Sequence, residues 1–167
     1  MSLEPPPEDP TAETRAYRRA LGSFATGVCV VAADSDQGPL GLTINSFTSV
    51  SLEPRLILWC LDERCERWAA FAAAERFAVH VLPASDRARA ARFSRGVGLL
   101  QPGEFKRMGD GPPCLPEALA RFDCVTHDRI QMGDHMIIIG RVEAFDSTAG
   151  EALTFWRGRY GSVGGEE

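Results

Sequence analysis

A hydroxyl-rich stretch from Gly41 to Pro54 holds the residues of this sequence that are best suited to bind a neutral ligand. Its apolar residues alternate with small or polar ones at both ends, as in β-strands, and no charge occurs before Glu53. Asn45 and Ser46 interrupt the alternation, and these residue types favour turns and irregular backbone. A strand broken in this way leaves main-chain N–H and C=O groups that must find partners elsewhere. The pattern therefore predicts a site for a flat, neutral ligand with a polar edge.

The same stretch also has a simpler interpretation as ordinary structure. Threonine is common in strands and serine in turns, so two hydroxyl-rich strands that face solvent would have the same composition. Residue chemistry by itself leaves both interpretations open.

The rest of the chain predicts a mainly β fold in which tight turns join most strands. Apolar patterns predict further strands at 28–33, 56–61, 77–82, 118–131, 136–145 and 154–160. Turn residues occur at 34–39 and at 132–135, where Gly133-Asp134 suits a two-residue hairpin, and 94–116 is a predicted long loop. Strands joined in this way favour a partly open β-barrel with helices on its flank over a series of βαβ units.

Three helices are predicted on the flank of this barrel. The first begins at Asp9-Pro10, the second is capped by Asp62 and contains Trp68, and the third runs from Ser85 to Phe93. The first helix has an apolar stripe of Tyr17, Ala20, Leu21 and Phe24, and an opposite face of Arg15, Arg18 and Arg19. We interpret these arginines as a solvated face, with a specific anion site as the alternative.

Length and charge exclude several classes of protein. A chain of 167 residues predicts one domain, with a flexible leader at 1–12, the domain at 13–163 and a tail at 164–167. A net charge of -5 and a pI of about 5.3 argue against a nucleic-acid-binding surface. The apolar runs are too short to span a bilayer, and no signal-peptide pattern is visible. Five cysteines without C-x-x-C spacing predict a reducing, cytoplasmic compartment, with neither disulfides nor a metal cluster.

Three motifs together resemble the flavin reductase family. They are Phe24-Ala-Thr-Gly-Val28, the stretch from Gly41 to Pro54, and Arg157-Gly-Arg-Tyr-Gly161, and they occur in the family's order and spacing. The resemblance runs from Tyr17 to Val163. It implies an FMN-binding split barrel, which is a Greek-key-like antiparallel β-barrel with flanking helices. It also implies NAD(P)H:flavin oxidoreductase activity, a homodimer with flavin near the subunit interface and, as in many relatives, reduction of flavin for a monooxygenase partner.

The resemblance assigns the flavin ring to the hydroxyl-rich stretch. The expected contacts are main-chain groups between Thr43 and Ser46, together with nearby hydroxyls: Thr43, Ile44, Asn45, Ser46, Ser49 and Ser51. Uncharged donors of this kind can hold both the oxidised and the reduced ring.

The flavin phosphate is expected at the start of the helix after Leu61, where N–H groups and the helix dipole favour an anion. The expected phosphate contacts are the Cys65 N–H and Arg67, and Cys60 and Leu61 just before this turn are further expected cofactor-binding residues. Many relatives have Ser-Ser-x-Thr at this turn, whereas this chain has Arg64-Cys-Glu-Arg67. Either arginine could replace the hydroxyl contacts with charge-assisted bonds, or Glu66 could pair with one of them and weaken the site.

The resemblance places a few more side chains near the nicotinamide nucleotide. His135, in a Gly-Asp-His motif, is expected on the nicotinamide side of the flavin, and Phe93 with the loop after it could cover the adenine half. Arg157, Arg159 and Tyr160 are further contacts on the cofactor side. His80 and His127 lie within predicted strands and are interpreted as structural.

The resulting hypothesis is hydride transfer from C4 of NADH or NADPH to N5 of FMN or FAD. No catalytic residue and no metal is required, because the two cofactors supply the chemistry. Two alternatives stay open: chemistry like that of pyridoxamine-phosphate oxidase on a similar barrel, and a non-enzymatic flavin- or haem-binding module.

Overall fold

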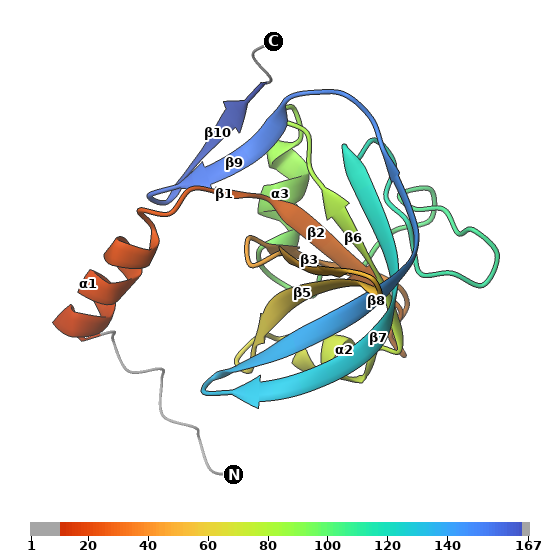
Figure 1. Ribbon diagram of the computed structural model, residues 1–167, viewed down its shortest axis with the longest axis horizontal. Helices are drawn as coiled ribbons and strands as arrows, with labels where there is room; N and C mark the ends of the chain where they lie inside the picture. The colour runs from red at the N-terminus through yellow and green to blue at the C-terminus, as the bar shows by residue number, and fades with distance from the viewer. Residues whose placement is uncertain (1–10, 165–167) are drawn as a thin grey trace.

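The computed structural model describes residues 11–164 and has a mainly β architecture, as the sequence predicts (Figure 1). Three helices lie in the described part: α1 (Ala12–Leu21), α2 (Trp68–Ala73) and α3 (Arg87–Phe93). The strands are β1 (Thr26–Gly27), β2 (Cys29–Ala33), β3 (Leu40–Ile44), β4 (Thr48–Leu52), β5 (Arg55–Asp62), β6 (Arg76–Val81), β7 (Ala120–Met132), β8 (His135–Ser147), β9 (Ala152–Trp156) and β10 (Arg159–Val163).

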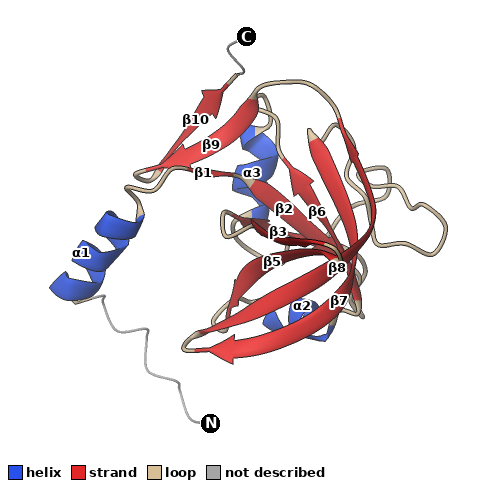
Figure 2. Cartoon of the chain, in the orientation of Figure 1, coloured by secondary structure: helices blue, strands red, loops and turns tan. Residues whose placement is uncertain are grey.

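The strands form two antiparallel sheets, and the larger one curves into a partly open barrel (Figure 2). Its seven strands follow the order β3-β2-β6-β7-β8-β5-β4, and β1, β9 and β10 form a smaller sheet beside it. The hydroxyl-rich stretch is therefore not a hairpin, because β3 and β4 lie at opposite edges of the larger sheet. The Ser46 hydroxyl links the segment between them to β5, since it accepts a hydrogen bond from the Cys60 N–H at 2.9 Å.

Two apolar clusters fill the molecule on the two sides of β2. Trp59, Phe71 and Phe77 lie in the cluster on one side. The ring centroid of Trp59 lies 5.6 Å from that of Phe71 and 6.0 Å from that of Phe77. The other cluster contains Val30 and Phe93, beneath α3. All five residues of β2 are buried, which confirms the prediction of a strand covered on both faces.

His80 is buried in β6 and has a structural role, as predicted. Its Nδ1 lies 3.0 Å from the Val30 carbonyl oxygen, and its Nε2 accepts a hydrogen bond from the Leu115 N–H at 3.0 Å. Burial lowers the pKa of His80 to about 4, so the ring is neutral at physiological pH. The side chain thereby joins the end of the long loop to the barrel.

The observed helix starts differ from the sequence prediction, and of the three described helices only α1 has a side-chain cap. In α1 the N-cap is Thr11, whose hydroxyl accepts from the Thr14 N–H at 3.1 Å, and the predicted start at Asp9-Pro10 lies outside the described residues. Helix α2 starts at Trp68, because Asp62 belongs to β5 and its carboxylate accepts from the Arg64 N–H at 2.9 Å. Asp86, one residue after the predicted Ser85, precedes α3.

The end of the chain also departs from the prediction. Two strands, β9 and β10, replace the single strand expected at 154–160, and Arg157-Gly158 forms the turn between them. The predicted turn at Gly133-Asp134 joins β7 to β8 as expected. The long loop is also confirmed, since no helix or named strand interrupts the described residues between α3 and β7.

Helix α1 stands away from the larger sheet (Figure 1). None of its residues is buried, and three apolar side chains at or just after the helix are largely exposed: Tyr17 at 66%, Leu21 at 57% and Phe24 at 78%. The apolar stripe is therefore present but covers no core of this chain.

Candidate functional site

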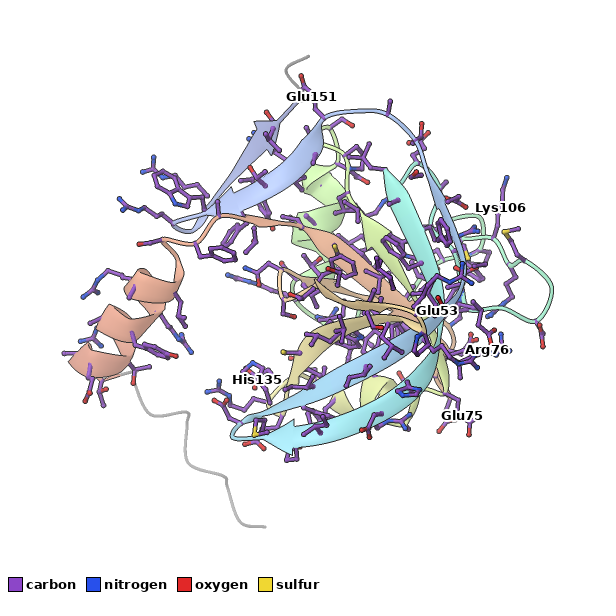
Figure 3. The ribbon with its side chains drawn as sticks, in the orientation of Figure 1. Glu53, Glu75, Arg76, Lys106, His135 and Glu151 are labelled. Carbon is purple, nitrogen blue, oxygen red and sulfur yellow. The ribbon has the colours of Figure 1, made fainter. Side chains whose placement is uncertain are left out.

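A cavity of about 570 Å³ opens where β3, β5 and the β7–β8 hairpin come together. Four segments line it. The first is Leu42–Ser46 at the end of β3, and the second consists of Cys60 and Asp62 in β5 with 64–67 after it. The others are Ser94–Gly96 after α3 and His135 at the start of β8. Figure 3 labels His135 near the tip of that hairpin. Segments far apart in the sequence thus meet at one site.

The wall formed by the end of β3 presents unpaired main-chain groups. Within the described part of the chain, the main-chain groups of Asn45, Ser46 and Phe47 take part in no backbone–backbone hydrogen bond. The β2–β3 ladder ends at Ile44, and the β4–β5 ladder begins at Thr48. This confirms that the interruption frees polar backbone groups, and the cavity lies beside them.

The hydroxyls of the same wall are already used within the protein. Thr43 Oγ1 donates to the Ala90 carbonyl oxygen at 2.7 Å, and Ser46 Oγ is bound to the main chain of Cys60. A ligand at this wall therefore meets main-chain groups and the exposed Asn45 amide in preference to serine and threonine hydroxyls.

Charged residues also line the cavity: the three arginines Arg64, Arg67 and Arg95, and the two acids Asp62 and Glu66. Arg64 Nη2 lies 3.0 Å from Asp62 Oδ2, and this contact lowers the pKa of the Asp62 carboxyl. The alternative in which Glu66 pairs with an arginine is absent from the ion pairs of the described residues, and Arg64 pairs with Asp62 and Asp134 instead.

Arg67 is only 5% exposed and its guanidinium holds two other segments. Nη1 donates to the carbonyl oxygens of Gly41 and Phe93, at 2.7 Å each. Nε is buried and has no partner in the protein. A Cβ at Gly98 would lie 2.5 Å from the Gly41 oxygen and 2.7 Å from Nη1, so glycine is required where the loop passes over this arginine.

The expected phosphate contacts after Leu61 are only partly available. The Cys65 N–H, which was expected to bind the phosphate, donates to the Asp62 carbonyl oxygen at 3.0 Å instead. Helix α2 begins at Trp68 and has only six residues, so it offers no strong dipole at this turn. The Arg67 side chain still lines the cavity and leaves Nε unpaired, which fits an anionic group.

His135 lines the cavity, and its expected place on the nicotinamide side of a flavin stays a prediction. Its Nδ1 lies 2.7 Å from Asp134 Oδ1, and it pairs with Asp62 in the β5–β8 register. The hydrogen bond between His135 and Asp134 lowers the pKa of the Asp134 carboxyl. Because Asp134 engages Nδ1, the Nε2 atom is the ring nitrogen left to meet a ligand.

Several predicted site residues lie elsewhere. Leu61 and Phe93 are fully buried core residues, and Phe93 packs on Gly41. Ser49 and Ser51 lie on the edge strand β4 and do not line the cavity. Cys60 does line it, and burial raises the pKa of its thiol.

Two residues of the last motif lie in neighbouring cavities. Tyr160 packs against Phe155 in a smaller cavity of about 190 Å³, which shares Thr43, Ile44, Asn45 and Ser94 with the larger one. Arg157 lies in a third cavity, beside the end of α1.

Sequence reasoning did not single out Arg95 or its neighbours Ser94 and Gly96. The available signal was the run Ser-Arg-Gly-Val-Gly directly after a predicted helix, where closely spaced glycines indicate a loop that approaches other backbone. Among the described residues, no group of three or more His, Cys, Asp or Glu side chains is arranged to hold a metal ion. In the same part of the chain, no helix has the length and apolar character needed to cross a membrane.

The fold and the cavity define an antiparallel split barrel whose cavity combines free main-chain groups with three arginines. The family model described as "Flavin reductase like domain" matches residues 21–164, and this chain belongs to that family.

Three known proteins illustrate the relationship. The chain is 41% identical over 148 residues to FMN reductase (NADH) SmoA from Agrobacterium fabrum, covering 89% of this chain and 85% of that protein. It is 36% identical to the reductase component of the flavin-dependent trigonelline monooxygenase from Acinetobacter baylyi, covering 91% of this chain but only 50% of that longer protein. The NADH:FAD oxidoreductase SgcE6 from Streptomyces globisporus, solved with NAD and FAD fragments, superposes with a TM-score of 0.81 at 34% identity over 92% of this chain and 94% of that chain.

Proposed function

We propose that this chain is an NADH- or NADPH-dependent flavin reductase that transfers hydride from nicotinamide C4 to N5 of FMN or FAD. The observation that carries the proposal is that one cavity combines free main-chain groups with positive charge. Main-chain groups of 45–47 make no backbone hydrogen bond beside it, and Arg64, Arg67 and Arg95 are in its lining. The names of SmoA and SgcE6 support the same reaction class.

A bound flavin would supply the redox chemistry, accepting a hydride and passing on its electrons. The main-chain groups at 45–47 hydrogen-bond the polar rim of the ring without adding charge. Arg95 and the unpaired Nε of Arg67 balance the phosphate charge. His135 Nε2 binds the nicotinamide donor, with Nδ1 held by Asp134, and so orients it over the ring.

The assembly and the acceptor are part of the same proposal. The exposed apolar stripe of α1 supports a homodimer in which a second copy of the chain covers Tyr17, Leu21 and Phe24. The name of the Acinetobacter relative supports a role as the reductase component of a two-component monooxygenase. The free cysteines of the described chain are consistent with a reducing, cytoplasmic setting.

An anaerobic titration tests the proposed reaction. Purified protein is mixed with FMN or FAD, NADH or NADPH is added, and the visible absorption band of oxidised flavin is followed. Fast bleaching that requires the protein supports the proposal. A band that persists with both nucleotides contradicts it and favours a flavin- or haem-binding module.

A further inference from the structure

A third cavity, of about 650 Å³, lies between the end of α1 and the turn that joins β9 to β10. Figure 1 shows these two elements next to each other at the same end of the molecule. Three arginines and several small residues line the cavity. We call this site the arginine pocket: Arg18, Arg19 and Arg157, with Gly22 and Ser23 among the small residues.

Hydrogen bonds fix the two sides of the arginine pocket to each other. The Arg157 N–H donates to the Gly22 carbonyl oxygen at 3.0 Å, and Trp156 Nε1 donates to the Ser23 carbonyl oxygen at 3.1 Å. A Cβ at Gly22 would lie 3.7 Å from the Arg157 Cα, so the two backbones are close. The pocket is therefore a defined feature of the tertiary structure.

Among residues 11–164, no acid forms an ion pair with any of the three arginines. All three side chains are exposed. The whole chain has a net charge of -5, so this concentration of positive charge is local. Arg18 and Arg19 lie in the last turn of α1, where they complement the helix dipole. That explanation does not extend to Arg157.

The conformation of Arg157 is the second unusual feature. Its φ is +48° and that of Gly158 is +77°, so both central residues of this two-residue turn are left-handed. Such turns favour asparagine, aspartate or glycine at the first position, and a long side chain there is unfavourable. Unfavourable backbone conformations of this kind occur preferentially at functional sites. Here the Arg157 guanidinium lies over the Trp156 ring, 4.7 Å from its centroid, and shares the lining of the cavity with Arg18 and Arg19.

The same hairpin connects the arginine pocket with the flavin site. Phe155 and Tyr160 line the small cavity that shares Thr43, Ile44 and Asn45 with the main cavity. Trp156 and Arg157 follow Phe155 directly in the chain. An elongated ligand with one end beside the flavin ring can therefore follow the hairpin and place anionic groups among the arginines.

We propose that Arg18, Arg19 and Arg157 bind a phosphate group of the nicotinamide nucleotide. The group is either the pyrophosphate that NADH and NADPH share or the 2′-phosphate that only NADPH has. Guanidinium groups bind phosphate oxygens through paired, charge-assisted hydrogen bonds. Three full positive charges outweigh the negative end of the α1 dipole, which amounts to about half a charge. The inference rests on the proposed flavin reductase function.

Kinetics of pocket variants test this inference. We expect Arg157→Gly, and the double variant Arg18→Ala with Arg19→Ala, to raise KM for the nucleotide about tenfold at low salt with little change in kcat. Glycine suits the left-handed turn, so Arg157→Gly retains the fold, and Arg157→Lys should recover part of the affinity. Arg87→Ala is the matched control, because it removes one exposed charge that lines none of the three cavities.

The choice of nucleotide distinguishes the two phosphates. If the variants raise KM equally for NADH and NADPH, the arginines bind the pyrophosphate. If they raise KM for NADPH alone, the arginines bind the 2′-phosphate. Calorimetry measures the affinity of the protein for 5′-ADP and 2′,5′-ADP without flavin reduction. Arg157→Gly should weaken the binding of one or both of these ligands. If neither ligand binds the wild-type protein and KM values of the variants match those of Arg87→Ala, the inference is wrong. Failure of the wild-type protein to bleach flavin would instead contradict the proposed function.

Discussion

Arg67 Nη1 donates a hydrogen bond to the carbonyl oxygen of Phe93 at 2.7 Å, which ties the start of α2 to the end of α3. The same nitrogen also donates to the Gly41 carbonyl oxygen in β3. One buried guanidinium thus holds three segments that are far apart in the sequence, and the loop that begins at Ser94 leaves from this point.

Replacing Arg67 should weaken both folding and flavin binding. Arg67→Met removes two charge-assisted bonds and leaves two carbonyl oxygens buried, so we expect a loss of about 3 kcal/mol in the free energy of unfolding. Urea denaturation measures this loss, and fluorescence titration with FMN measures binding. Arg64→Ala, at an exposed ion pair, should cost less than about 1 kcal/mol. Equal stabilities of the two variants would contradict this assignment of Arg67.

Gly98→Ala tests the same contact from the loop side. The added Cβ would approach both the Gly41 carbonyl oxygen and Arg67 Nη1, and the φ of +68° disfavours alanine. We expect a destabilisation of about 2 kcal/mol and weaker flavin binding. Gly96→Ala is the comparison, because its φ of +73° imposes the same backbone penalty while a Cβ there would meet no atom within 4 Å. The difference between the two variants isolates the clash, and no difference would argue against it.

Ser46→Ala should open the junction between β3 and β5. Loss of the hydroxyl leaves the Cys60 N–H without its partner at 2.9 Å, at a cost of about 1 kcal/mol. Flavin affinity should fall severalfold, because the neighbouring main-chain groups lose their fixed orientation. Ser49→Ala, on the exposed edge strand, should change stability by less than about 0.5 kcal/mol. Thermal melts with and without FMN compare the two, and identical behaviour would refute the proposed role of Ser46.

Stability should decrease on acidification because His80 is buried in its neutral form. Its pKa is lowered from 6.5 to about 4 in the folded chain, so between these values the unfolded chain binds more protons. The free energy of unfolding should therefore fall as pH decreases through this range, by about 3 kcal/mol at most. Denaturation curves of wild-type protein and His80→Gln, collected from pH 7 to pH 4, isolate this contribution. A constant difference between the two across that range would exclude it.

His135→Ala should impair use of the nicotinamide donor more than binding of flavin. We expect kcat/KM for NADH to fall about tenfold or more, because the ring nitrogen that orients the donor is lost. Flavin affinity, measured by fluorescence quenching, should change less than twofold, a sign that the cavity walls are intact. His127→Ala, on β7 and outside the cavity, serves as the control. A parallel loss of flavin affinity would assign His135 to the flavin instead.

The sequence pattern predicted the barrel well, for local reasons. Burial of every residue of β2 and the Gly133-Asp134 turn follow from apolar runs and turn residues that act over a few neighbouring positions. The split of the last strand at Arg157 was missed, because an arginine is an unusual first residue for a two-residue hairpin turn.

The sequence alone determined that a neutral, hydroxyl-rich segment breaks at Asn45 and cannot continue its ladder, because backbone conformation there depends on adjacent residue types. Only the tertiary structure decided which polar groups stay free. The Ser46 hydroxyl and the Arg67 Nη1 atom are used by partners 14 and 26 residues away, whereas main-chain groups at 45–47 are not. Such long-range hydrogen bonds depend on how the sheet curves, and no local pattern encodes which donors they consume.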